Sequence, residues 1–371
     1  MTFVTGTASG NTLTRIAWSS KLHRETRNRF FFNQRGMVSA DTGDEPSFER
    51  RSGTPIVSQE QLNNRRAQEV RVAMQRQLTT NRTVGTGTRS LDAQTYGTAS
   101  MVDNEETMEL YNMDCWVEQM KHATSFNTPE IQDLRTEFKM TIRAADVLAD
   151  WMAAEQEESV LDAAYDRYSA NVVSSSLASA SDPPSNSLQY AGNQADDASV
   201  TSSDTLTSAE LRRVFAWCDV NNINPIRHMG RDCFIMLVHT YNYVDLNADS
   251  EFREAFQHGW QRASSPSNNP LFDMADAEYM GIYVHKYNRI RKAATNGNAY
   301  RCLVLGSDAL AEGVTARPRL VRRKEDQYED TYGLGIKAIC GWSRADWRNQ
   351  GAATTVNQSL AIWSTYGNTS V

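Results

Sequence analysis

The chain has 371 residues, 40% of them hydrophobic, which is enough for two or three domains, and it holds no apolar run of the roughly 18 residues that a membrane span needs. Its five cysteines are odd in number and widely spaced, which argues against a secreted disulfide scaffold or a zinc module and indicates a soluble protein of the cytosol. The net charge of −7 conceals an asymmetry, because residues 1–100 carry 14 Lys and Arg against 8 Asp and Glu, whereas the remainder carries 24 against 37. This split suggests either a basic arm that reaches toward nucleic acid or toward another copy of the chain, or a solvated basic loop.

Two N-terminal segments lack the periodicity of folded elements. Residues 1–51 show only an aromatic cluster among arginines, and we expect an extended arm there. Residues 52–102 are polar and interrupted by glycines, so they are either disordered or a loop that a partner orders. The arginines of this loop are candidate contacts with that partner. They are Arg65, Arg66, Arg71, Arg76, Arg82 and Arg89.

A strand and a long helix are expected next. Apolar residues alternate between positions 106 and 117, as they do in a half-buried strand. Thr128 is typical of a helix cap, and apolar residues then recur at steps of three and four to about Tyr168. A helix of roughly 40 residues would span about 60 Å. Its exposed side is acidic and includes Glu155 and Asp162.

The second half of the chain predicts a mixed region of helices and strands. Residues 172–206 are rich in serine and hold no Lys or Arg, so we expect an inserted loop or linker. Thr207 and Glu210 form the pattern of a capping box that begins a helix, and a second amphipathic helix contains Phe252. Short apolar runs predict strands at residues 233–238, 282–285, 302–305, 318–321 and 334–342.

No group of residues in the sequence makes a convincing catalytic or metal site. Ser307 lacks the flanking glycines of a nucleophile elbow, and we expect it to cap a helix. His239 has no acid or nucleophile identifiable beside it, which favours a hydrogen-bonded core histidine. Residues 245–249 lack the glycine and the bidentate Glu of a calcium loop. We therefore predict a protein without enzymatic activity, cofactor or metal ion.

Several local passages occur in the order in which one known protein family has them. They are DNEET at 103–107, WVEQMKHA at 116–123, LRTE at 134–137, ADWM at 149–152, SNNPLF at 267–272, GIYVH at 281–285 and YEDTYGLGI at 328–336. Together with the order of arm, loop, strand, long helix and mixed region, this resembles the Hong Kong 97-type capsid fold of tailed phages. The passages themselves resemble the major capsid family of N-four-like podophages.

The resemblance implies an α+β fold with a fixed order of segments. They are an N-terminal arm (1–51), an extension loop (52–102), a peripheral domain with a spine helix (103–171), a Ser-rich insertion or linker (172–206), an axial domain (207–319), return strands of the peripheral domain (320–348) and a C-terminal tail (349–371).

The resemblance also implies the partners of the chain. Copies of such a protein assemble in the host bacterial cytoplasm into hexamers and pentamers of an icosahedral head. That head encloses double-stranded DNA without sequence specificity. A portal protein is a further partner, and scaffolding and decoration proteins accompany some shells.

In shells of this type the extension loop reaches across the spine region of a neighbour. We therefore expect the six loop arginines to pair with carboxylates such as Glu155 and Asp162 of an adjacent copy, each pair weak but repeated many times. The alternative is a basic-armed nucleic-acid-binding protein that forms no shell, whose DNA binding would depend steeply on salt. The acidic remainder of the chain favours the capsid interpretation.

Overall fold

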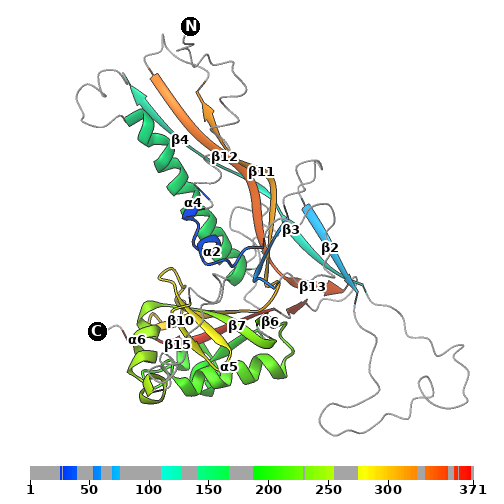
Figure 1. The fold of residues 1–371 in the computed structure, drawn as a ribbon, viewed down its shortest axis with the longest axis vertical. Coiled ribbons are helices and arrows are strands. Elements are labelled where there is room, and N and C mark those ends of the chain that lie inside the picture. The colour runs from blue at the N-terminus through cyan, green and yellow to red at the C-terminus, as the bar shows by residue number, and fades with distance from the viewer. Residues whose placement is uncertain are drawn as a thin grey trace, which may run out of the picture.

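The computed structural model describes twelve parts of the chain, which are residues 26, 28–39, 53–59, 69–75, 110–127, 140–166, 187–228, 230–254, 275–323, 331–349, 355–357 and 359–368. These parts form an elongated molecule, in which a long twisted sheet with one helix stands on a compact α/β part (Figure 1). We call the two parts the long-sheet layer and the seven-stranded layer.

The long-sheet layer is built on four strands in the order β1, β11, β12 and β4. The strands span Ile56–Gln59, Leu310–Arg322, Thr331–Arg344 and Glu118–Asn127. β1 is parallel to β11, and the other neighbours are antiparallel. Buried side chains recur at every second residue of β12, as Ile336, Ala338 and Cys340. One face of the sheet is therefore covered by another element.

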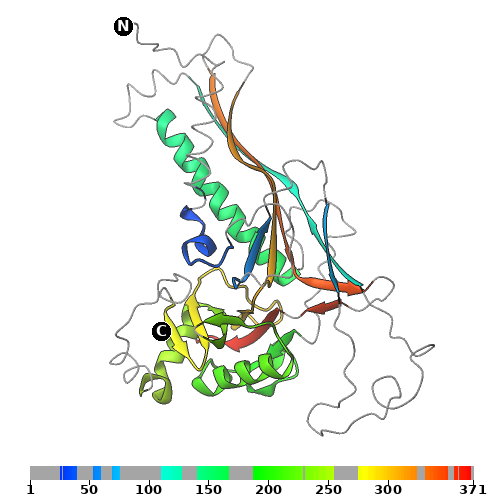
Figure 2. The same ribbon diagram turned by 45° about the vertical axis from the view of Figure 1, so that its right-hand side comes forward.

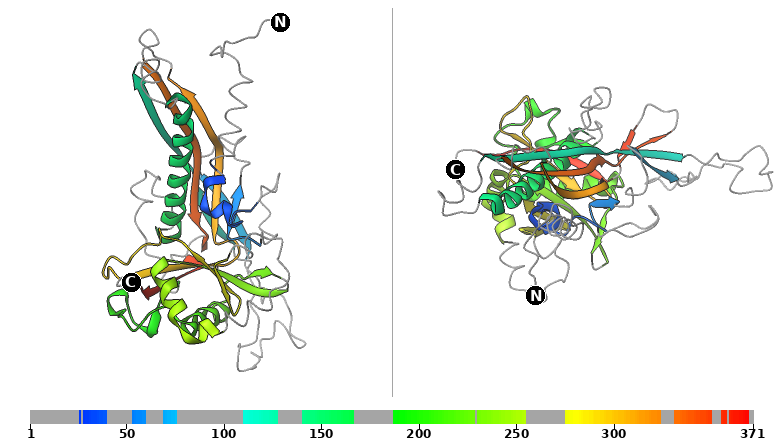
Figure 3. Two further views of the ribbon diagram at one scale, coloured as in Figure 1. Left: turned by 60° about the vertical axis from the view of Figure 1, so that its left-hand side comes forward. Right: turned by 90° about the horizontal axis from the view of Figure 1, so that it is seen from above.

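That element is α4, Met140–Asp166, a helix of 27 residues that spans about 40 Å along the sheet (Figures 1 and 3). Its Met152 is buried, and its Trp151 stacks on His122 of β4 with 4.6 Å between the ring centroids. The expected acidic helix is confirmed over these residues. Its expected start at Thr128 lies outside the described residues.

A second four-stranded sheet continues from the base of the long sheet in the order β14, β13, β3 and β2. Its strands span Thr355–Asn357, Asp346–Asn349, Leu110–Trp116 and Glu69–Gln75. β3 confirms the strand expected within residues 106–117, and the chain continues through Val117 into β4. Both β1 and β2 fall in the segment 52–102, so part of the expected loop is strand.

The seven-stranded layer is the compact part at the base (Figure 2). Its sheet runs β5, β15, β10, β7, β9 and β8, and β6 pairs with β7. In that order the strands span Leu188–Tyr190, Leu360–Tyr366, Ala299–Leu305, Arg231–Val238, Ile282–Lys286, Ala277–Tyr279 and Ile226–His228. The helices α5, Ser208–Val220, and α6, Thr240–Ala248, share a core with the sheet through Val214, Met236 and Leu246.

The strands expected in the second half of the chain are present. β7, β9, β10 and β12 contain four of the predicted runs, and β11 contains the fifth. β11 begins at Leu310, so the domain boundary expected at residue 319 falls inside a strand. The capping box is confirmed in part, because the N–H of Glu210 donates to Oγ1 of Thr207 at 3.4 Å.

The structure corrects three expectations. Residues 349–371, expected to be a tail, supply β15, which pairs with β10 and β5 inside the seven-stranded layer. Residues 172–206, expected to be an insertion or linker, join the same layer from β5 onward, where Asp197 accepts a hydrogen bond from Arg301 at 2.7 Å. Ser307, expected to cap a helix, lies in the turn between β10 and β11, because strand rather than helix follows it.

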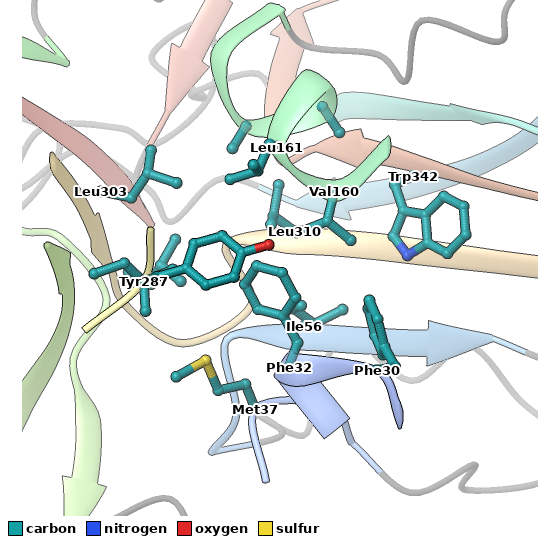
Figure 4. Packing of buried hydrophobic residues seen from close by; sticks show 14 of the residues in the cluster. Phe30, Phe32, Met37, Ile56, Val160, Leu161, Tyr287, Leu303, Leu310 and Trp342 are labelled. Atoms are coloured by element: carbon teal, nitrogen blue, oxygen red, sulfur yellow. The ribbon is translucent and has the colours of Figure 1, made fainter. Parts of the chain in front are cut away.

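Part of the expected N-terminal arm packs on its own chain. Residues 28–39 include the short helix α2, Phe31–Gln34. Phe30, Phe32 and Met37 are fully buried in one cluster with side chains of β1, α4 and β11 (Figure 4). The described piece of the segment 1–51 is therefore an intramolecular element, and residues 1–25 lie outside the described residues.

Candidate functional site

Charged groups of the described residues gather where α4 meets the N-terminal segment and the chain that follows β9. We call this place the Glu157 junction. Oε1 of Glu157 accepts a hydrogen bond from the backbone N–H of Phe31 at 2.8 Å, and its Oε2 accepts one from the hydroxyl of Tyr287 at 3.2 Å. Arg289 lies 3.6 Å from the same carboxylate. One side chain thus connects three segments that are far apart in the sequence.

Aromatic packing fixes the geometry of the Glu157 junction. The rings of Phe31 and Tyr287 are stacked with 4.5 Å between centroids, and Phe32 meets Tyr287 edge-on at 5.6 Å. Burial raises the pKa of the Tyr287 hydroxyl, and the charge of Glu157 raises it further. Tyr287 therefore keeps its proton at neutral pH and remains a hydrogen-bond donor to the carboxylate.

Arginines of the same chain bind the acidic side of α4. Arg29 lies 2.6 Å from Asp150, and Arg289 lies 3.3 Å from Glu158. Arg291 pairs with both Asp162 and Asp166. The sequence-predicted contact residue Asp162 is thus already engaged within its own subunit.

Glu155 differs from the other carboxylates of α4. It is half-buried, and it makes no ion pair with any part of the chain that the structure describes. Of the two carboxylates expected to meet a neighbour, Glu155 is the one left available for such a contact.

The structure describes little of the loop arginines. The backbone of Arg71 lies in β2, opposite Asp114 of β3. The other five arginines fall outside the described residues. Their pairing with a neighbour therefore stays a prediction.

A buried ion pair holds the other end of α4. Arg344 and Asp346 are almost inaccessible to solvent and lie 2.7 Å apart. The guanidinium also donates to the carbonyl oxygens of Ala164 and Tyr165 in the last turn of α4, each at 3.2 Å. Asn357 donates to the carboxylate at 3.0 Å. This network connects the helix, the long sheet and the strand that leads into β15.

The residues considered for catalysis have structural roles. His239 caps α6, where its Nδ1 accepts a hydrogen bond from the N–H of Tyr241 at 3.3 Å. The N–H of Ser307 donates to the carbonyl of Asn224 at 2.8 Å. Among the described residues, no hydrogen bond connects Ser307 with His239.

The cysteines are buried free thiols, as expected. Burial raises the pKa of Cys115 to about 12 and that of Cys302 to about 11, so neither is a thiolate at neutral pH. Among the described residues, no three His, Cys, Asp or Glu side chains are grouped as metal ligands. None of the described helices combines the length and the apolar character needed to cross a bilayer.

Sequence reasoning missed the arginines that bind α4 within its own chain. Arg29 precedes the aromatic cluster, and Arg289 and Arg291 are two residues apart, so they can project from the same side of an extended segment. That spacing was the available signal. What it could not show was that the segment lies beside a helix more than 100 residues earlier.

Comparison with known proteins agrees with this architecture. A family model described as phage capsid protein matches residues 7–364. No curated protein matches the sequence. The fold is similar to that of the capsid of Ralstonia phage GP4, with 16% identity, 92% of each chain covered and a TM-score of 0.69.

Two further capsid structures have the same fold. For the cyanophage Pam1 capsid the identity is 17%, with 89% of this chain and 95% of that chain covered and a TM-score of 0.64. For the acidic stable capsid of Helicobacter pylori bacteriophage KHP30 the identity is 13%, with 90% and 94% covered and a TM-score of 0.61. The expected capsid fold is thereby confirmed, whereas the N-four-like subtype stays a prediction. Since the family model spans nearly the whole sequence, the chain belongs to the phage capsid protein family.

Proposed function

We propose that copies of this chain form the wall of a tailed-phage head as hexamers and pentamers of a closed icosahedral shell. The observation that carries the proposal is the family match over residues 7–364. The elongated shape supports it, because a wall subunit must contact several neighbours at once.

In this proposal the two layers have different places in the shell. The long-sheet layer with α4 corresponds to the peripheral domain, and the seven-stranded layer corresponds to the axial domain that meets others at the symmetry axes. The extension loop is proposed to lie within residues 52–102 after β1, which belongs to the long sheet. The Glu157 junction connects α4 of the long-sheet layer to the chain that follows β9 of the seven-stranded layer, which supports a subunit that must repeat one geometry many times.

The loop arginines are proposed to contact α4 of a neighbour, with Glu155 as the available carboxylate. Charge reversal by Arg71→Glu with Arg76→Glu should reduce particle yield and make the remaining particles more sensitive to salt. Arg227→Glu, which affects an exposed pair with Asp232 in the seven-stranded layer, is the matched control. Particles of the loop variant that form and resist salt as the wild type does would contradict this contact.

The packaged genome is proposed to be double-stranded DNA held without sequence specificity. A net charge of −7 is consistent with a capsid wall that does not bind the DNA tightly during packaging. A portal protein is the expected partner at one vertex, and assembly is placed in the host cytoplasm.

Sedimentation and negative-stain imaging of the purified full-length protein test the proposed function directly. Shells or large capsomer assemblies support it. A persistent monomer or dimer that binds DNA with a steep salt dependence would instead support the nucleic-acid-binding alternative.

A further inference from the structure

Three cations lie in one row across the long sheet. Arg319 of β11 is in register with Lys337 of β12, and Lys337 is in register with Lys121 of β4. Residues directly opposite each other share a face, and adjacent strands are about 4.8 Å apart, so the row is about 10 Å long. We call it the basic row.

The basic row lies on the face of the sheet that α4 does not cover. The next residues along the strands, Leu320 and Ile336, are in register and pack in the core shared with α4. Alternation then turns Arg319 and Lys337 to the opposite face. Figure 3 shows α4 on only one side of these strands.

Nothing in the described part of the chain neutralises the basic row. Arg319 and Lys121 are exposed and Lys337 is half-buried, and none of them pairs with a carboxylate among the described residues. On one side the next positions on this face, Val321, Gly335 and Ala123, are uncharged. On the other side Ile339 and Gln119 are uncharged, and β11 has a register shift that contains a further exposed cation, Arg317. Like charges placed directly opposite each other destabilise a sheet, so the row is suited to an anionic partner.

A polypeptide suits the row better than DNA does. Three cations in a body of net charge −7 are few against the six to ten phosphate contacts that typically hold a protein on DNA. The basic row is about 10 Å long, and this length instead matches that of a short acidic segment. The hairpin of β11 and β12 is closed by such a segment, residues 324–330, which contains Glu325, Asp326, Glu329 and Asp330.

The reach of the chain favours a second copy as the donor of this segment. Lys337 is six residues from the start of β12 at Thr331, a distance of about 20 Å. Arg319 is four residues, about 13 Å, from Arg323 at the other end of the segment, so a loop that touched the row would need about 33 Å of backbone. The eight links from Arg323 to Thr331 span at most about 29 Å, so the backbone of a subunit's own segment cannot lie along the row.

We propose that the basic row of one subunit binds the acidic segment 324–330 of a second copy. The contact is heterologous, because the two partners contribute different surfaces. Copies related by a rotation that closes into a ring can therefore repeat the contact around a symmetry axis. This inference rests on the proposed function, because it needs copies that assemble.

Charge exchange tests the contact in the full-length chain. The row variant Arg319→Glu with Lys337→Glu should lower the yield of sedimenting particles at least tenfold at 0.15 M salt. The loop variant Glu325→Lys with Glu329→Lys should do the same. The combination of the two should return the yield to within twofold of the wild type.

Two controls separate this contact from misfolding and from a general effect of charge. The row variant turns the repulsion between positions 337 and 121 into an attraction and keeps one like-charged pair, at positions 319 and 337, so the unassembled subunit should melt no lower than the wild type. The acidic run at 103–109 supplies a matched charge change, Glu105→Lys with Glu109→Lys, which should not rescue the row variant.

The outcomes distinguish this contact from the proposed function. If wild-type particles form and the row variant assembles equally well, the contact is overturned while the proposed function stands. The contact is also overturned if the combined variant is not restored or if the 103–109 control rescues as well. If the wild-type chain itself forms no particles, the proposed function fails and the contact with it.

Discussion

The guanidinium of Arg344 lies 2.7 Å from the carboxylate of Asp346, and both side chains are sealed from solvent where α4 ends. Removing one partner leaves the other as an unpaired buried charge, which costs about 3–5 kcal/mol. Arg344→Met should therefore lower the free energy of unfolding of the unassembled subunit by about that amount in urea denaturation.

An exposed ion pair provides the control for this prediction. Arg212 and Glu251 lie 2.9 Å apart on the surface, so Arg212→Met should cost at most about 1 kcal/mol. The double variant Arg344→Met with Asp346→Leu should recover much of the lost stability, because no isolated charge remains. Equal losses for Arg344→Met and Arg212→Met would contradict the importance of the buried network.

Features that depend on neighbours in sequence could be predicted. The pattern at Thr207 and Glu210 gave a helix start because a cap joins residues three apart. The carboxylate of Glu210, expected to complete that capping box, instead accepts hydrogen bonds from the N–H of Gly192 and from the indole of Trp363. The tertiary partners of one side chain are set by the fold and leave no local pattern.

Features that depend on distant pairing could not be predicted. β15 lies in the segment that the sequence predicts to be a tail, because its partners, β10 and β5, are roughly 60 and 170 residues earlier in the chain. The same limit applies to the candidate site. The spacing of the carboxylates along α4 predicts its acidic face. It does not predict that Arg29 and Arg291 of the same chain bind that face.

Protonation of His239 should weaken the seven-stranded layer below neutral pH. Its Nδ1 accepts the N–H of Tyr241 only when unprotonated, and its ring stacks on Tyr300 at 4.3 Å. Partial burial lowers the pKa of His239, and Lys292 lowers it further. Because the unfolded chain then binds the proton more readily, stability is lost as the pH falls through and below about 6.5.

The variant His239→Asn isolates this contribution. Asparagine also caps helices but does not titrate in this range, so the variant should lose less stability than the wild type between pH 7 and pH 5. Thermal melting of the unassembled subunit at several pH values measures the difference. Parallel pH curves for the two proteins would show that His239 does not contribute.

Gly341 should not tolerate a side chain. A Cβ at this position would lie 1.8 Å from the carbonyl oxygen of Trp116, where β3 passes into β4. Because the obstacle is backbone, Gly341→Ala must displace a strand, and we expect a loss of about 3 kcal/mol or more. Gly297→Ala is the control, since nothing lies within 4 Å of its Cβ. Equal melting temperatures of the two variants would contradict the close approach of these strands.

The carboxylate of Glu157 should hold the N-terminal segment on α4. A hydrogen bond to a charged group contributes about 1.5–3 kcal/mol, so Glu157→Ala should speed the hydrogen exchange of the Phe31 amide by about ten- to a hundredfold. Glu155→Ala, on the same helix but without a described ion-pair partner, should leave that amide as protected as in the wild type. Mass spectrometry of peptides that cover residues 28–39 follows the exchange. Protection that survives Glu157→Ala would mean that the packing of Phe30 and Phe32 and the pair of Arg29 with Asp150 anchor the segment without Glu157.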